Sequence, residues 1–362
     1  MAEKTKILNY INVFRGLAIL LIVAGHTMQF SGCSKLIDKV NVEMVCGGTA
    51  LFIFISGFLF QHLSNKFEYK TYLSKKWTNV ILPYLFTAIP GLAFCFMLPT
   101  DYGNSFDGLP IILQIPMMLS VGRVHNTPAW FIPMIIIFFI LSYLLLWLER
   151  KNILYKLLPV LFLVTIIFAR QDVDYESVKN LTYTQKYFAY ASYVIMGFVH
   201  FLSMYVFGMF CSKHKEIIDK FYDKRLIFWG LMILTASVNV YLALNTSYNN
   251  GTISKVFMTI LLLGYLKHYD EWLISHTRLN KVLDILAKYS FGLFFIHWYV
   301  FFLYNRALHL PKVIEYTGIQ TFILTETRFV SVTLISLLIL YLCKVILLKL
   351  NKDAKTRSFI GV

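Results

Sequence analysis

Long apolar runs recur along the whole sequence and constrain the fold more than any other feature. A transmembrane helix needs about 20 mostly apolar residues, and its backbone groups must be hydrogen-bonded within the segment because lipid offers no partners. Runs of this length exclude a β-barrel, whose strands would read as short alternating segments. We therefore predict an all-α integral membrane protein, a polytopic bundle of about ten transmembrane helices over 9–30, 45–63, 79–98, 129–148, 153–169, 188–211, 226–244, 252–267, 285–305 and 326–349.

Composition agrees with one integrated membrane domain over residues 1–362. Hydrophobic residues make up 58% of the chain and charged residues only 15%, which leaves too little polar sequence for a separate soluble domain. The apolar segment 110–121 carries Pro110 and Pro116. It is shorter than a span, so we expect a re-entrant or interfacial piece there.

The net charge of +15 would suggest a nucleic-acid partner in a soluble protein. Here the cations gather in alternate loops between the predicted spans, which is the pattern of the positive-inside rule. We therefore expect no nucleic-acid partner and two cytoplasmic termini. The loop and tail cations are Lys66, Lys70, Lys75, Lys76, Arg150, Lys151, Lys213, Lys215, Lys220, Lys224, Arg225, Lys349, Lys352, Lys355 and Arg357.

The five cysteines are scattered and lack the spacing of a metal site, so no metal is expected. Cys33 and Cys46 both fall near the predicted outer face. The sequence leaves open whether these two pair or stay free thiols.

Arg15 and His26 bracket ten small or apolar residues in the first predicted span. Eleven residues at about 100° each make roughly three helical turns, so both side chains lie on one face, about 16 Å apart along the axis. An arginine at membrane depth costs on the order of 2.5–3.5 kcal/mol on insertion scales. The pair therefore indicates a polar path inside a bundle rather than a lipid-facing surface.

Both residues have a catalytic and a structural interpretation. A neutral imidazole at His26 can take a proton from a hydroxyl group near neutral pH. The alternative is a structural histidine that is hydrogen-bonded to a neighbouring helix. The guanidinium of Arg15 can hold a phosphate or a developing oxyanion, and its alternative is a cation that sets topology at the membrane surface.

Five motifs, taken in order, resemble the membrane acyltransferase-3 family. The first is the Arg15-x10-His26 pair, and the others span nearly the whole chain. They are GGTALFIFISGFLF at 47–60, KKWTNVILPY at 75–84, PAWFIP at 128–133 and SFGLFFIHW at 290–298. Each motif is weak alone, but the ordered set is fairly specific.

The resemblance implies an integral membrane O-acyltransferase of the bacterial cytoplasmic membrane. Its members move acyl groups, usually acetyl, from cytoplasmic acyl-CoA to hydroxyls of envelope or secreted glycans and lipid-linked sugars. His26 then becomes the catalytic base and Arg15 its partner, with no bound cofactor besides the acetyl-CoA or other acyl-CoA donor. The sequence departs from the family at Ala50, where many members have Asp, and at Lys75 and Lys76, where many have Arg-x-x-Arg.

Four further residues are tentative substrate contacts. Lys75 and Lys76 can meet CoA phosphates as point charges, and Trp130 can stack on a sugar or an adenine ring or serve as an interfacial anchor. His297 lies in the middle of a predicted span, where it lines an acceptor path or makes a structural hydrogen bond. We interpret Ser56 as a packing residue rather than a nucleophile. We interpret Glu43 as a solvated loop carboxylate, and the alternative for Glu43 is that it orients His26.

A glycan exporter or flippase is the alternative function. About ten spans and intramembrane cations permit it, but a carrier has no particular need for the Arg15–His26 spacing, and the sequence shows no internal repeat of the kind many carriers have. The acceptor sugar, the choice of acetyl or succinyl, and the oligomeric state stay open. We expect the outer loops 31–45, 99–128 and 306–325 to set acceptor specificity, but they carry no readable motif.

Overall fold

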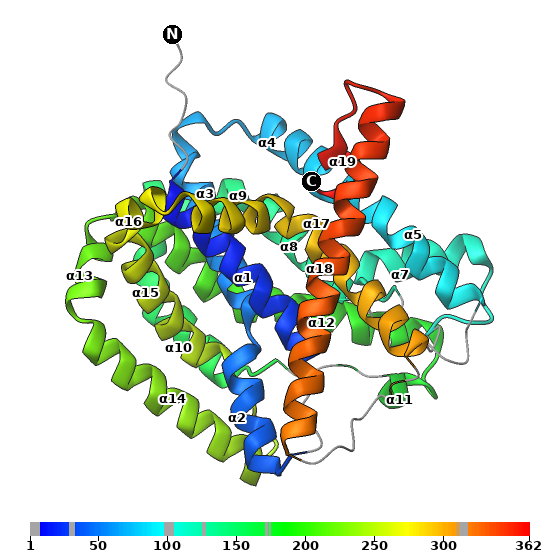
Figure 1. Ribbon diagram of the computed structural model, residues 1–362, viewed down its shortest axis with the longest axis horizontal. Helices are drawn as coiled ribbons and strands as arrows, with labels where there is room; N and C mark the ends of the chain where they lie inside the picture. The colour runs from blue at the N-terminus through cyan, green and yellow to red at the C-terminus, as the bar shows by residue number, and fades with distance from the viewer. Residues whose placement is uncertain are drawn as a thin grey trace. The chain divides into compact units, whose positions relative to one another are not determined.

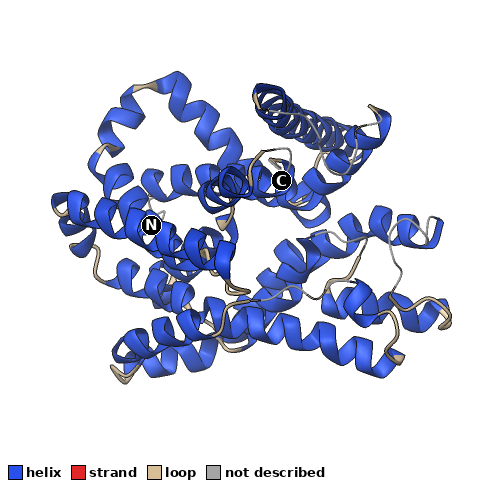
Figure 2. Cartoon of the chain, turned by 90° about the horizontal axis from the view of Figure 1, so that it is seen from below, coloured by secondary structure: helices blue, strands red, loops and turns tan. Residues whose placement is uncertain are grey.

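The computed structural model describes residues 8–28, 33–97, 105–124, 128–170, 173, 175–308, 310 and 318–362. Within these ranges every regular element is a helix (Figure 2). The predicted all-α class is thus confirmed. Within two of the predicted outer loops, residues 99–104, 125–127, 309 and 311–317 lie outside the described residues.

Seven helices in the described part of the chain are long and apolar enough to cross a membrane. An eighth candidate is a pair, Pro128–Ile140 and Ser142–Arg150, that is bent by 45°. The predicted number of about ten is not confirmed, because the run at 153–169 forms only short helical pieces and the run at 252–267 forms a helix of 17 residues. The seven are Asn9–Thr27, Lys35–His62, Tyr69–Met97, Tyr183–Lys213, Arg225–Asn245, Thr277–Ala307 and Ile319–Leu350.

The chain forms two compact units. Unit 1 contains Met1–Ser64, Met204–Phe294 and Asn305–Leu334, and unit 2 contains Asn65–Ser203, Phe295–Tyr304 and Ile335–Val362. Three long helices have residues in both units: α12 (Tyr183–Lys213), α17 (Thr277–Ala307) and α18 (Ile319–Leu350). The expectation of a single domain over 1–362 stays a prediction.

Unit 1 is built around α1 (Asn9–Thr27) and α3 (Gly48–His62), which pack against each other. Glycine permits this close approach: a Cβ on Gly48 would lie 2.8 Å from the backbone nitrogen of Ile22. Gly57 meets the backbone of Tyr205 on α12 in the same way. Such small-residue contacts replace the hydrophobic driving force that is missing between helices in lipid.

The remaining helices of unit 1 surround this pair. They are α2 (Lys35–Val45), α13 (Ile217–Asp223), α14 (Arg225–Asn245), α15 (Thr252–His268) and α16 (Asp270–Ser275), together with parts of α12, α17 and α18. α14 runs alongside α15 over much of its length (Figure 1).

Unit 2 begins with η1 (Ser64–Lys66) at its boundary and continues through α4 to α11. Its helices are α4 (Tyr69–Lys76), the π-helix η2 (Trp77–Ile81), α5 (Leu82–Met97), α7 (Ile111–Val121), η3 (Pro128–Trp130), α8 (Phe131–Ile140), α9 (Ser142–Arg150), η4 (Leu154–Leu157), α10 (Leu158–Ile167), α11 (Tyr175–Val178) and the C-terminal α19 (Thr356–Ile360). α7 has 11 residues with Pro116 inside. Its length is too short for a span, as predicted for 110–121.

The π-helix η2 has a local cause in Pro83. Proline has no backbone N–H and its ring clashes with the carbonyl four residues before it, which here is that of Asn79. The wider turn relieves this clash, and the amide of Leu82 bonds to the carbonyl of Trp77 instead. The result is a widened helical segment at the start of α5, with α4 directly before it.

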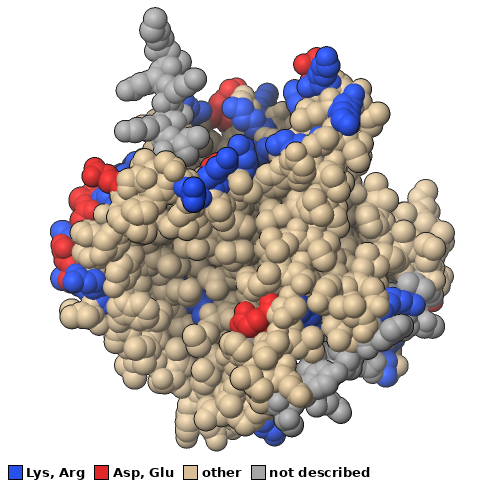
Figure 3. Space-filling model, in the orientation of Figure 1, with Lys and Arg blue, Asp and Glu red and all other residues tan. Residues whose placement is uncertain are grey.

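Charged side chains are unevenly distributed over the surface. On the face in Figure 3, Lys and Arg occur in groups that are separated by wide uncharged areas. Many large apolar side chains are exposed on the candidate spans, for example Leu226 on α14 and Leu334 on α18. An apolar exterior of this kind suits contact with lipid.

Candidate active site and donor pocket

The pair Arg15 and His26 lies on one unbroken helix, α1. The first predicted span, 9–30, corresponds to Asn9–Thr27, and residues 29 and 30 lie outside the described ranges. Both side chains are half-buried within unit 1. Because the helix is continuous, its rise keeps them about 16 Å apart along the axis.

Arg15 belongs to a polar group at the start of α1. Its Nη2 donates to Oδ1 of Asn12 at 3.1 Å, and Nδ2 of Asn12 donates to Oδ1 of Asp284 on α17 at 2.7 Å. The helices come close here because the next residue is Gly16, where a Cβ would lie 2.7 Å from the carbonyl oxygen of Leu283. Arg15 is therefore oriented by neighbours rather than lying loose at a membrane surface.

His26 lies one residue before the C-terminal end of α1. Gly25 packs against Cys46, whose Sγ lies 3.8 Å from the Gly25 carbonyl oxygen. Thr27, the last residue of the helix, is fully buried and its carbonyl oxygen accepts a hydrogen bond from Nε of Arg328 at 2.7 Å. Cys33 and Cys46 are free thiols, so the question of their pairing is answered in favour of free cysteines.

Glu43 is a buried helical residue, which corrects its reading as a solvated loop acid. Its side chain is 7% exposed and accepts hydrogen bonds from Nδ2 of Asn239, at 2.6 Å, and from Oγ of Ser254. Lys255 donates to the Glu43 carbonyl oxygen and lies 3.9 Å from Oε1. A buried carboxylate is stable only when paired and hydrogen-bonded, and α14 and α15 supply these partners, which sequence spacing does not reveal.

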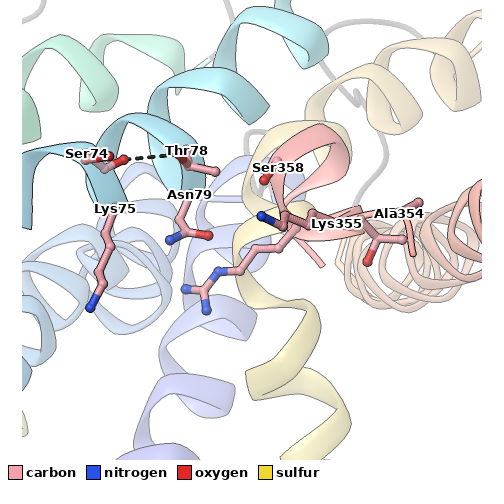
Figure 4. Close-up of a pocket in the computed structure, with 9 residues that line it drawn as sticks. Ser74, Lys75, Thr78, Asn79, Ala354, Lys355 and Ser358 are labelled. Carbon is pink, nitrogen blue, oxygen red and sulfur yellow. Dashed lines mark hydrogen bonds between the residues drawn. The ribbon is translucent and has the colours of Figure 1, made fainter. Parts of the chain in front are cut away.

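Lys75 lines a pocket of about 500 Å³ in unit 2 (Figure 4). Lys75 and Asn79 lie on its α4–η2 side, and Lys355 and Ser358 lie on its C-terminal side. Phe359 of the C-terminal helix packs against Phe86 of α5, with the rings tilted by 40° and their centroids 5.0 Å apart. The complete lining is Ser74, Lys75, Thr78, Asn79, Ala354, Lys355, Thr356, Arg357 and Ser358.

The pocket carries three cations, Lys75, Lys355 and Arg357, and among the described residues no carboxylate lines it. None of these three cations forms an ion pair with an Asp or Glu among the described residues. Lys76 points elsewhere, because its Nζ lies 4.6 Å from the ring centre of Phe139. Such a lining suits an anion with several oxygens, such as a phosphate group.

Trp130 on η3 and His297 on α17 both lie in unit 2. One face of the Trp130 ring is covered by the guanidinium of Arg170, 3.9 Å from the ring centre, and Tyr193 meets the ring edge-on at 5.6 Å. His297 is 0% exposed in the middle of α17. Their roles toward substrate stay predictions.

Two further sequence interpretations bear on the chemistry. Oγ of Ser56 donates to the Phe52 carbonyl oxygen at 2.9 Å within α3, which agrees with its reading as a packing residue rather than a nucleophile. Across the ranges that the structure describes, no three His, Cys, Asp or Glu side chains gather as metal ligands would.

Sequence reasoning missed Arg328 as a buried neighbour of the His26 end of α1, although an arginine inside an apolar run was a usable signal.

A polytopic helical membrane protein, with an arginine and a histidine on one face of its first helix, is the class that this fold and this site define. The chain belongs to the acyltransferase-3 family, because the model of that acyltransferase domain matches residues 8–347. Neither the comparison with curated proteins nor that with solved structures found a match. The protein is thus a multi-pass membrane acyltransferase, as the five motifs predict.

Proposed function

We propose that the protein is an O-acyltransferase that moves an acyl group, with acetyl as the first candidate, from cytoplasmic acyl-CoA to a glycan hydroxyl. The acceptor is a cell-envelope or secreted glycan or a lipid-linked sugar, and the protein resides in a bacterial cytoplasmic membrane. One observation carries the proposal: a chain of this family presents Arg15 and His26 on a single continuous helix. This arrangement supplies a base at one end and an anion-binding group at the other.

In the proposed reaction His26 acts as general base. The acceptor oxygen attacks the thioester carbonyl while the imidazole takes the hydroxyl proton, and a C–O bond forms. The tetrahedral oxyanion then collapses, the C–S bond breaks, and the imidazolium returns the proton to the departing CoA thiolate. The products are an acylated glycan and free CoA, and the base is restored to its neutral form.

Arg15 has a different task from His26, because a separation of about 16 Å is too long for both to act on one carbonyl. We assign Arg15 to the CoA portion of the donor, where a guanidinium binds phosphate oxygens well. The extended pantetheine arm then accounts for the distance between the phosphates and the reacting thioester.

The cationic pocket of unit 2 supports a phosphate-bearing donor. Lys75 was expected to contact CoA phosphates, and the pocket adds Lys355 and Arg357 from the C-terminal segment. Those two cations follow residue 347, where the family match ends. We propose that this pocket binds a phosphate group of the donor, with Arg357 providing the planar guanidinium that the stretch around Lys75 and Lys76 lacks.

The test is transfer of label from radiolabelled acetyl-CoA into glycan in membranes that contain the protein. We expect His26→Ala to abolish transfer while the amount of folded protein stays the same. His276→Ala is the matched control, since His276 is exposed at the junction of α16 and α17. Full transfer by His26→Ala would refute the proposed base, and no transfer by wild-type protein with any acyl-CoA would favour the exporter alternative.

A further inference from the structure

Arg328 is one of the largest fully buried side chains of the described residues, with 0% exposure. It is the tenth residue of α18, which is a candidate membrane span. A charged side chain inside a membrane span is costly, so such residues usually have a defined partner and a function. One partner of Arg328 is the carbonyl oxygen of Thr27, to which its Nε donates at 2.7 Å.

The Thr27 carbonyl group lies at the C-terminal end of α1. The last four carbonyl groups of a helix have no partner within the helix, and Thr27 is the final residue of α1. A cation at this end also complements the negative pole of the helix dipole. Arg328 therefore caps α1 at the residue that follows His26.

The other contacts at this end of α1 make the cap specific. Oγ1 of Thr27 donates back to the Val23 carbonyl oxygen at 2.8 Å, and Gly25 is in contact with Cys46. The turn that carries His26 is thus held by Arg328 at its end and by the α2–α3 connection at its side. Without the cap, the last turn of a helix is the part that frays first.

We propose that Arg328 is a positioning residue for His26, and this inference depends on the proposed function of His26 as the base. Arg328 fixes the last carbonyl of α1 and so holds the imidazole at a constant place and angle. The planar Nε–H of arginine makes this contact directionally, whereas a lysine ammonium is a point charge on a flexible stem. A merely structural contact between α1 and α18 would lower stability and leave the turnover of folded protein unchanged.

The experiment compares wild-type protein with Arg328→Gln and Arg328→Lys in lipid nanodiscs. Because a misplacement of about 1 Å costs on the order of 100-fold, we expect Arg328→Gln to lower kcat by about that factor. The KM for acetyl-CoA should stay within about twofold, since donor binding is not affected. Arg328→Lys should fold with the charge retained and recover only a small part of kcat.

A second measurement requires no turnover. Carbethoxylation of His26 by diethyl pyrocarbonate, followed by peptide mass spectrometry, reports how the imidazole is presented. We expect faster modification in both Arg328 variants, because the end of α1 is released. Thr333→Val is the matched control, because Thr333 lies on the same helix and its hydroxyl donates to the Phe329 carbonyl oxygen within that helix.

Several outcomes would overturn the inference. These are a kcat within threefold of wild type in folded Arg328→Gln, an unchanged rate of His26 modification, or full recovery of kcat by Arg328→Lys. If wild-type protein transfers no label, the proposed function fails, and the modification rate of His26 still decides whether Arg328 positions it.

Discussion

Arg15 and His26 lie near opposite ends of one rigid helix, and this distance decides what each can do. A neutral imidazole at the end of α1 can exchange a proton with a hydroxyl, whereas the Arg15 guanidinium donates to Asn12, which in turn donates to Asp284. The proposal accordingly gives the two residues separate tasks, a base and an anion-binding group.

We expect Arg15→Gln to raise the KM for acetyl-CoA about tenfold or more, because a hydrogen bond to a charged group contributes about 1.5–3 kcal/mol. Arg15→Lys should fall between Gln and wild type, since it keeps the charge but not the planar donors. The measurement is initial-rate kinetics in membranes, with the exposed Arg278→Gln as control. A fall in kcat at constant KM would place Arg15 at the reaction centre instead.

At the scale of elements, the short C-terminal helix α19 is important because it lies beside the cationic pocket. Phe359 packs against Phe86, and this contact helps to hold Lys355 and Arg357 at the pocket beside Lys75. Three cations with no carboxylate in the described lining repel one another, so an anion in the pocket is favoured on electrostatic grounds.

We therefore expect Arg357→Gln to raise the KM for acetyl-CoA about fivefold, equivalent to about 1 kcal/mol for a solvent-exposed contact. The effect should shrink with dephospho-CoA if the pocket binds the 3′-phosphate, and with rising salt, which screens exposed charges. Lys352→Gln, an exposed change in the same tail outside the pocket lining, is the control. Equal KM values for Arg357→Gln and wild type would remove the pocket from the donor site.

Close helix contacts are a second element-scale feature, and Gly57 is the sharpest example. A Cβ at this position would clash with the backbone carbonyl of Tyr205, which cannot rotate away. We expect Gly57→Ala to lower the free energy of unfolding by about 1–3 kcal/mol or more, through overpacking. Thermal denaturation of purified protein checks this.

Gly230→Ala provides the matched control, because nothing lies within 4 Å of the position of its added Cβ. Alanine is favoured over glycine in a helix interior by about 1 kcal/mol, so this variant should be as stable as wild type or more stable. A Gly57→Ala protein with unchanged stability would show that α3 and α12 do not pack as described.

At the scale of the whole molecule, the pocket constrains how the chain crosses the membrane. The α4–η2 segment and the C-terminal segment line one pocket within unit 2, so we expect both to lie on the same side of the membrane. If the spans Asn9–Thr27 and Lys35–His62 each cross once, the N-terminus lies on that side too. Two termini on one side would require an even number of crossings, and their cytoplasmic location stays a prediction from the loop cations.

We expect a reporter that works only in the cytoplasm to be active when it is fused to either terminus. A reporter that works only after export should be inactive at both. A fusion placed after Lys352 tests the C-terminal side directly, and one in the 245–251 loop serves as the opposite control. An exported C-terminus would contradict both the loop-charge argument and the assignment of the pocket to a cytoplasmic donor.

The sequence by itself determined the features that depend on neighbours along the chain. Apolar run length set the helical class, and the 3.6-residue period placed Arg15 and His26 on one face at a known spacing. The predicted number of about ten spans is not confirmed, because run length alone does not tell a crossing helix from the short pieces at 153–169. The ordered motifs also sufficed to predict the family.

Only the tertiary structure decided which distant groups meet. Arg328 caps Thr27 across 301 residues, Lys255 pairs with Glu43 across 212, and the C-terminal cations join Lys75 in one pocket. Local periodicity carries no information on such contacts, because they depend on how the helices pack. A charge becomes buried only when packing brings it a partner, so the surroundings of His26 and the lining of the cationic pocket could be read only from the folded chain.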